Sequence, residues 1–315
     1  MSSAIDLDGL AARIARELAQ RDVAQRVAPA TPDQDGLHPS PSPTPGASGA
    51  APRGVAYVRD EARIADFIDH TVLKPETTRS EIEQLCAEAL EHKFAAVCVN
   101  PVWVSLCAQR LRGSDVAVAT VIGFPLGANR PEIKAAEASL AVQQGATELD
   151  MVAAIGQVKS GDWVHVADDI AGVVRASSGR LVKVIIESAQ LTPVEIIKVS
   201  ALAREAGAQY VKTSTGFHPS GGASAEAVAL MRLVVGDQMG VKASGGVRDC
   251  ATALRMIASG ATRIGTSSGV AMAACLGRGP LPMRELLASP SAHGATCRSG
   301  SCSIEPEKGG SAQPY

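Results

Sequence analysis

The sequence predicts a closed barrel of eight parallel strands, each followed by a helix, over residues 56–288. Short runs rich in valine and isoleucine alternate there with amphipathic helical patterns. Such runs are typical of parallel strands that are covered on both faces. Eight units of this kind fit a (β/α)8 barrel. An open doubly wound sheet is the alternative, but no GxGxxG motif opens the first unit and no P-loop motif occurs.

The individual elements follow from this alternation and from their boundary residues. Glycine followed by alanine recurs between a helical pattern and a strand, at Gly145, Gly207 and Gly260. Glycine suits the left-handed residue that ends many helices. We expect strands at 67–71, 94–101, 116–125, 147–155, 181–188, 209–215, 241–246 and 263–268. Helical patterns separate most of them, at 78–93, 131–144, 162–177, 193–206, 225–237 and 249–259.

Segments of different character flank the barrel. Residues 1–27 contain an amphipathic pattern over 4–27, with an apolar stripe at helical spacing and Ser3 or Asp6 as its cap. Residues 28–55 hold seven prolines and little to bury, which predicts an extended linker. Residues 289–315 are rich in glycine and serine, which predicts a flexible tail.

Composition and charge narrow the function classes. Of 315 residues, 46% are hydrophobic and 20% charged, and the net charge is -2, so we expect neither a nucleic-acid partner nor a membrane surface. We find no apolar stretch that would span a bilayer and no apolar core of a signal peptide. The seven cysteines form no CxxC motif and favour free thiols in a reducing cytoplasm.

Polar residues stand at the carboxyl ends of the expected strands, where a parallel barrel presents its active site. We expect four of them to converge on one small space: Asp69, Asp150, Lys212 and Lys242. Any one of them, taken alone, could instead belong to a structural ion pair inside the barrel. The strand alternation puts Lys183 and Glu187 on one face, and we interpret that pair as structural.

Two lysines at neighbouring strand ends can make one amine reactive. A free lysine has a pKa of about 10.4, and lowering it to near 7 requires roughly 4–5 kcal/mol. A second ammonium about 5 Å away supplies roughly 3 kcal/mol at an effective dielectric constant near 20. Desolvation supplies the remainder. A neutral amine attacks a carbonyl to form an imine, and a nearby carboxylate can move the protons, which is the chemistry of a Schiff-base aldolase.

Glycine-rich segments after the last two strands indicate a phosphate site. The sequences SGG (244–246) and GTSSG (265–269) occupy the loops that cradle phosphate in many barrels. Ordinary tight turns are the alternative reading. The histidines show no metal-binding spacing, so we expect neither a metal nor another cofactor.

Eight motifs, in this order along the chain, resemble the deoxyribose-phosphate aldolase family. They are IDHTVLKP (68–75), AAVCVNP (95–101), ATVIGFPLG (119–127), GATELDMV (145–152), KVIIES (183–188), YVKTSTGF (210–217), GVKASGGVR (240–248) and GATRIGTSSG (260–269). The resemblance implies a TIM barrel that cleaves 2-deoxy-D-ribose 5-phosphate reversibly to acetaldehyde and D-glyceraldehyde 3-phosphate.

The resemblance also implies residue roles. Lys212 matches the Schiff-base lysine, Lys242 the lysine that depresses its pKa, Asp150 the proton-relay aspartate and Asp69 the carboxylate beside the lysines. Substrate and phosphate contacts are implied for Cys98, Thr215, Gly216, Gly245, Gly246, Ser267 and Ser268. Some relatives have a lysine where this chain has Phe217, which weakens the expectation of a phosphate-binding cation there. Some end in a tyrosine that assists proton transfer, and this chain ends in Tyr315.

The N-terminal segment is similar to encapsulation peptides, which carry enzymes into bacterial microcompartments. We therefore expect residues 4–27 either to dock on a shell protein or to pack on the barrel or a neighbouring subunit. We also expect a homodimer. Two functions rival the aldolase: a sugar-phosphate isomerase that uses acid–base chemistry alone, and a non-catalytic barrel carried as cargo.

Overall fold

The computed structural model describes residues 6–13, 16, 61–276 and 279–288. The chain divides into two compact units, Met1–Gly54 and Val55–Tyr315. The predicted linker (28–55) and tail (289–315) lie outside the described residues, as does most of the predicted N-terminal helix.

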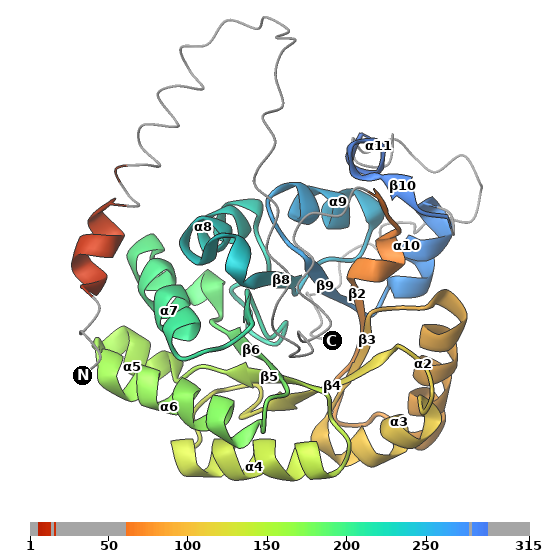
Figure 1. Cartoon of the computed structure of the whole chain (residues 1–315), viewed down its shortest axis with the longest axis horizontal. Coiled ribbons are helices and arrows are strands. Elements are labelled where there is room, and N and C mark those ends of the chain that lie inside the picture. The colour runs from red at the N-terminus through yellow and green to blue at the C-terminus, as the bar shows by residue number, and fades with distance from the viewer. Residues whose placement is uncertain (1–5, 14–15, 17–60, 277–278, 289–315) are drawn as a thin grey trace, which may run out of the picture. The chain divides into compact units, whose positions relative to one another are not determined.

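The second unit contains a closed barrel of eight parallel strands in chain order (Figure 1). The ring closes because the first and last barrel strands pair, with Ile68 opposite Ile264. An open doubly wound sheet would leave two unpaired edges, so the closure confirms the (β/α)8 prediction. The strands are β2 (Ile68–Val72), β3 (Ala96–Val99), β4 (Ala117–Ile122), β5 (Glu148–Val152), β6 (Leu181–Ile185), β7 (Tyr210–Lys212), β8 (Gly240–Ser244) and β9 (Arg263–Thr266).

Helices surround the barrel (Figure 1). They are α2 (Arg79–His92), α3 (Val104–Arg110), α4 (Pro131–Gln143), α5 (Ile155–Ser160), α6 (Trp163–Ala176), α7 (Pro193–Glu205), α8 (Ala225–Val235), α9 (Cys250–Ala258) and α10 (Gly269–Leu276). Single 3-10 turns lie at Ile64–Phe67, Pro101–Trp103, Ser188–Gln190 and Gly236–Gln238. A short antiparallel pair, β1 (Glu61–Ala62) with β10 (Leu281–Pro282), joins the segments before and after the barrel, and α11 (Met283–Leu287) follows it.

Local sequence signals explain several helix boundaries. The N-terminus of α2 is a capping box, in which Thr78 Oγ1 accepts from the Glu81 amide and Glu81 accepts from the Thr78 amide. Three glycines that follow helices have positive φ angles, as predicted: 109° at Gly145, 86° at Gly207 and 108° at Gly260. Glycine adopts this left-handed conformation without the steric cost that a Cβ imposes.

The structure differs from the prediction at several elements. The helices α3, α5 and α11 and the short strands β1 and β10 were not predicted, because seven residues or fewer are too short for a clear periodic pattern. The expected strands also run past the observed ones, most clearly 209–215 against Tyr210–Lys212. The residues beyond these strand ends form the loops at the carboxyl-terminal face of the barrel.

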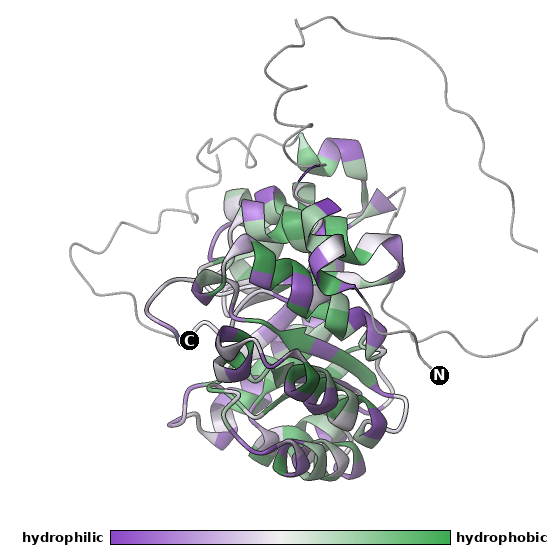
Figure 2. Ribbon diagram, turned by 90° about the vertical axis from the view of Figure 1, so that its left-hand side faces the viewer, coloured by the Kyte–Doolittle hydropathy of each residue, from purple (hydrophilic) through white to green (hydrophobic). Residues whose placement is uncertain are grey.

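Apolar residues fill the space between the barrel and its helices, and the strands carry much of the hydrophobic colouring in Figure 2. Ile68, Val97, Leu149, Val184 and Val241 are fully buried. Polar residues inside the barrel are therefore surrounded by a layer of apolar side chains. This layer lowers the local dielectric constant, which strengthens the charge interactions among those residues.

The first unit contributes a short helix over residues 7–13. The Gly9 amide donates to Asp6 Oδ1 at 2.8 Å, which confirms Asp6 as the cap of this helix. Within the described ranges, no helix is both long and apolar enough to cross a bilayer.

Candidate active site

The two lysines of the predicted site lie side by side. Lys212 ends β7 and is directly opposite Lys242 of β8 in the strand register. Only 2% of Lys212 is exposed and none of Lys242. Parallel pairing thus places two buried amines on neighbouring strands at the carboxyl-terminal side of the barrel.

A carboxylate on β5, which β6 separates from β7, joins these lysines. Asp150 of β5 accepts hydrogen bonds at its Oδ2 atom from Lys212 Nζ at 2.9 Å and Lys242 Nζ at 2.8 Å. Lys242 also donates to Asp69 Oδ2 of β2 at 2.5 Å. The structure therefore brings together all four residues that the sequence selected. Asp150 is placed to exchange protons with either amine.

The surroundings of the two lysines separate their pKa values. Burial lowers the pKa of Lys212; the Asp150 carboxylate opposes this shift and the Lys242 charge adds to it. Burial also acts against the charge of Lys242, but Asp150 and Asp69 outweigh it and raise the pKa of Lys242 above its usual value. Lys212 is thus the better candidate for a neutral nucleophile, and Lys242 stays charged. Burial, which we expected to be the smaller influence on Lys212, is the larger one.

The two aspartates keep their negative charge for the same reason. Burial favours their neutral forms, yet neighbouring cations lower the pKa of both carboxyls. The cations around Asp150 are Lys183, Lys212 and Lys242. Among the cations that act on Asp69, Arg263 has the largest effect. A carboxylate that stays ionised can serve as a proton acceptor at neutral pH.

Three further charged residues belong to the same network. Lys183, which we interpreted as structural, donates to Asp150 Oδ1 at 2.8 Å and to Glu148 Oε2 at 2.5 Å. Arg263 binds Asp69 and donates to Glu148 Oε1 at 2.9 Å. Sequence reasoning did not select Glu148 or Arg263. Period-two alternation could have done so for Glu148, which lies two residues before Asp150 on the same face of its strand.

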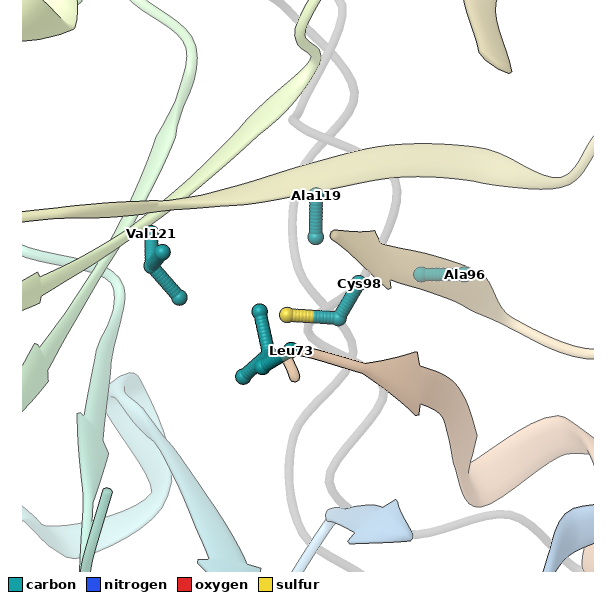
Figure 3. Close-up of a cluster of buried hydrophobic side chains, with 5 residues drawn as sticks. All are labelled: Leu73, Ala96, Cys98, Ala119 and Val121. Carbon is teal, nitrogen blue, oxygen red and sulfur yellow. The ribbon is translucent and has the colours of Figure 1, made fainter. Parts of the chain in front are cut away.

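Cys98 lies among small apolar side chains inside the barrel. Its thiol and the side chains of Leu73, Ala119 and Val121 point toward a common space (Figure 3). Burial raises the pKa of this thiol, so it remains protonated. Lys242, Asp150 and Lys212 act on this thiol electrostatically, so Cys98 lies near these three charged groups, and its contact with substrate stays a prediction.

Three glycines that we predicted to bind phosphate have positive φ angles. Gly216, Gly245 and Gly246 have φ angles of 85°, 81° and 79°. Gly245 approaches Gly222 so closely that a Cβ atom on Gly245 would lie 2.9 Å from the Gly222 Cα atom. Glycine is therefore required for the two loops to meet, and the backbone remains accessible at Gly246, which is exposed.

The loop after β9 leads into α10. Ser267 is exposed and Ser268 is half-buried just before Gly269, the first residue of this helix. The Ser268 amide donates to Thr266 Oγ1 at 3.0 Å, so that amide is already bonded. The two hydroxyl groups lie at a helix N-terminus, where partial positive charge favours anions.

The loop that follows Lys212 contains Thr215, a predicted substrate contact, and Phe217, which stands where some relatives have a lysine. The Thr215 hydroxyl donates to Glu187 Oε2 at 2.5 Å and accepts from the Phe217 amide at 3.1 Å, so it organises the loop that follows Lys212. Phe217 packs edge-on against Phe124 at 5.1 Å between ring centroids. A direct contact of Thr215 with substrate stays a prediction, and Tyr315 lies outside the described residues.

Comparison with known proteins identifies the family of this chain. A family model described as DeoC/LacD family aldolase matches residues 63–275. The chain is 56% identical over 210 residues to a deoxyribose-phosphate aldolase of Streptococcus suis, covering 67% of this chain and 95% of that protein. It is 57% identical over 206 residues to one from Brevibacillus brevis, covering 65% and 93%.

A solved structure gives the same result. The tetrameric deoxyribose phosphate aldolase from Aeropyrum pernix matches with a TM-score of 0.61 and 35% identity, over 66% of this chain and 88% of that one. The lysines, the aspartates and the glycine loops all fall within the range that the family model covers. The chain belongs to the DeoC/LacD family of aldolases.

Proposed function

We propose that this aldolase cleaves 2-deoxy-D-ribose 5-phosphate to acetaldehyde and D-glyceraldehyde 3-phosphate, reversibly, through an imine on Lys212. One observation carries the proposal: Lys212, a buried lysine with a lowered pKa, shares the Asp150 carboxylate with Lys242, which stays charged. The relatives that bear this name support the choice of substrate. Family membership favours an aldolase over the isomerase and over a non-catalytic cargo barrel.

The first step is nucleophilic attack. The neutral Lys212 Nζ adds to the C1 aldehyde carbon of the open-chain sugar, and loss of water leaves a protonated imine. Lys242 and Asp150 lie within 3 Å of each other at this point and supply and accept the protons of that dehydration. The positive imine then withdraws electrons from the carbon chain.

Carbon–carbon cleavage follows from that electron sink. Asp150, through a water molecule and Lys242, takes the proton from the C3 hydroxyl group. The C2–C3 electron pair moves into the imine, D-glyceraldehyde 3-phosphate leaves, and an enamine remains on Lys212. Protonation of the enamine carbon and hydrolysis release acetaldehyde and restore the amine. The phosphate is held at the opposite end of the substrate by Gly216, Gly245, Gly246, Ser267 and Ser268.

Adduct mapping tests the nucleophile. The protein is incubated with acetaldehyde, reduced with cyanoborohydride, digested and analysed by mass spectrometry. We expect a reduced two-carbon adduct on Lys212 that is lost in Lys212→Ala and retained in Lys159→Met, which removes an exposed lysine on α5. An adduct on Lys242 would reverse the two roles. If neither Lys212 nor Lys242 carries an adduct, the imine mechanism is refuted.

We further propose that residues 4–27 dock this enzyme on a bacterial microcompartment shell protein, within a cytoplasmic organelle that retains the volatile acetaldehyde. The amphipathic sequence pattern and the proline-rich segment that follows it support this proposal. Deletion of residues 1–50 should leave aldolase activity intact and abolish co-purification with the shell. Unchanged co-purification would remove the idea.

The homodimer expected from the sequence stays a prediction. Sedimentation velocity of the full chain and of the deletion variant would determine the oligomeric state. It would also show whether the N-terminal segment contributes to the assembly.

A further inference from the structure

Seven charged side chains form one buried group inside the barrel. We call it the barrel charge cluster; its members are Asp69, Glu148, Asp150, Lys183, Lys212, Lys242 and Arg263. Each residue is at most 5% exposed. The cluster contains four cationic side chains and three carboxylates. With every group ionised it would carry one excess positive charge.

The contacts among these groups are uneven. Lys183 lies within 3.3 Å of three carboxylates. Lys242 and Arg263 each contact two. Lys212 contacts one, Asp150, which it shares with two other lysines. Lys212 is therefore the cation with the least negative charge around it.

A dry interior disfavours an uncompensated charge, so one proton of the cluster is held weakly. Arg263 cannot release it, because a guanidinium stays protonated in proteins. Of the three lysines, Lys212 has the fewest carboxylate partners and loses the least by becoming neutral. When it does so, three cations face three carboxylates. The other titratable groups that face the cluster are Cys98 of β3 and Tyr210 of β7, and burial keeps both neutral.

We infer that Arg263 and Glu148 are positioning residues that set the charge balance of the barrel interior so that Lys212 is the amine left uncharged. Arg263 supplies the third permanent cation, and Glu148 supplies the third carboxylate, which holds Lys183 and Arg263 in their charged forms. Both side chains act through the cluster and not on the substrate. The inference rests on the proposed role of Lys212 as nucleophile.

The arrangement of Arg263 fits such a role. Its guanidinium binds Asp69 and Glu148 together and lies 5.8 Å from the centroid of the Tyr210 ring. Arg263 is also directly opposite Lys242 in the strand register. A second cation is thereby fixed beside the two lysines, and the ring and both carboxylates prevent it from turning away.

The charge count predicts shifts of opposite sign. The measured quantity is the pH midpoint of the acidic limb of kcat/KM, which reports the free enzyme. Arg263→Gln removes the excess cation, so Lys212 holds its proton more tightly and the midpoint rises by about one pH unit. Glu148→Gln adds a second excess charge and lowers the midpoint by about the same amount. The double variant restores the original count and returns the midpoint to the wild-type value.

Controls separate this effect from loss of structure. Asp169→Asn breaks a buried ion pair between α4 and α6 and should leave the midpoint unchanged. Arg263→Lys keeps the charge and should keep the midpoint. Should Arg263→Gln not fold, Lys183→Gln removes the same charge and should also raise the midpoint.

Two outcomes overturn the inference. One is a shift of both single variants in the same direction, as simple distortion of the site would produce. The other is a double variant that stays displaced from the wild type. Adduct mapping on the wild-type enzyme keeps the two proposals apart: no adduct on Lys212 refutes the proposed function, whereas an adduct without opposed midpoints refutes the charge balance alone.

Discussion

Among the residues that the structure describes, lysine amines are buried in two places, and their pKa values differ. Inside the barrel, Lys183, Lys212 and Lys242 share carboxylates with one another. Between α4 and α6, Lys134 pairs with Asp169 at 2.7 Å, and neither side chain has any exposure. Both places remove an ammonium group from water, which favours the neutral amine.

The number of carboxylates around each amine accounts for the difference. Burial lowers the pKa of Lys134, and the single carboxylate of Asp169 does not reverse the shift. Lys183, with three carboxylates, and Lys242, with two, have raised pKa values in spite of burial. Lys212 has one shared carboxylate, and its pKa is lowered like that of Lys134. Location then separates these two, since Lys212 lies at a strand end, whereas Lys134 lies on a helix behind the barrel wall.

The largest expected effect comes from the shared carboxylate. Asp150→Asn removes the proton acceptor, so kcat for retro-aldol cleavage should fall by about 10²–10⁴-fold. The trapped acetaldehyde adduct on Lys212 should still form, because the amine remains and loses a partner that stabilised its charged form. Steady-state kinetics and mass spectrometry measure the two results. An equal fall in Asp169→Asn, which removes a buried aspartate outside the barrel interior, would show that kcat reports general damage and not proton transfer.

Much of the barrel site could be predicted from charged residues that interrupt Val/Ile-rich runs. The expectation that all four lie at strand ends was wrong: Lys212 ends β7, whereas Lys242, Asp150 and Asp69 lie inside β8, β5 and β2. They still meet, because side chains of parallel strands that face the barrel interior share one space. Glu148 and Arg263 are the first residues of β5 and β9, nearer the amino-terminal side of the barrel. Their contacts depend on strand register, which places Arg263 opposite Lys242, and no local pattern fixes that register.

The buried lysine between α4 and α6 could not be predicted at all. A lysine in an amphipathic helical pattern is normally exposed, because charged side chains are seldom fully buried. Lys134 is buried because α4 packs on α6, which brings Asp169 within reach, and because its amine donates to the Val152 carbonyl at 2.9 Å. These partners lie 18 and 35 residues away along the chain. Only the packing of the two helices reveals the pair.

The next largest expected effect is a loss of stability on substitution of the Lys134–Asp169 pair between α4 and α6. Lys134→Met leaves Asp169 buried without a cation, which should lower the free energy of unfolding by about 3–5 kcal/mol. Replacing both partners, Lys134→Met with Asp169→Leu, should restore stability to the wild-type value or above it, because no buried charge remains. Urea denaturation followed by circular dichroism measures both changes. In folded protein, kcat/KM should stay at the wild-type value, since this pair lies outside the barrel interior.

An additive loss in that double variant would contradict the comparison. It would mean that the pair stabilises the fold through its own attraction. The two places would then differ in position only, and not in how well their charges are compensated.

The smallest expected effect is the pH dependence of stability, and its sign differs between the two places. Cations hold the pKa of Asp150 well below 3.8, so its contribution to stability is complete above that pH and is lost as the pH falls below it. Burial instead raises the pKa of Asp169 above 3.8. Its protonated form is favoured in the folded chain, so stability falls as the pH rises from 3.8 toward the folded-state pKa.

Removing each carboxyl separates the two contributions. Below about pH 4, Asp150→Asn should reduce the slope of the unfolding free energy against pH. The reduction is at most about 1.4 kcal/mol per pH unit, which corresponds to one proton. Just above that pH, Asp169→Asn should make stability rise more steeply with pH than in the wild type. The variant lacks the Asp169 carboxyl, whose titration lowers stability as the pH rises. Urea titrations at half-unit steps from pH 3 to 7 resolve both slopes. Equal slopes in the two variants would mean that the barrel and the helix pair hold their carboxyls in the same charge state, which the lysine contacts do not allow.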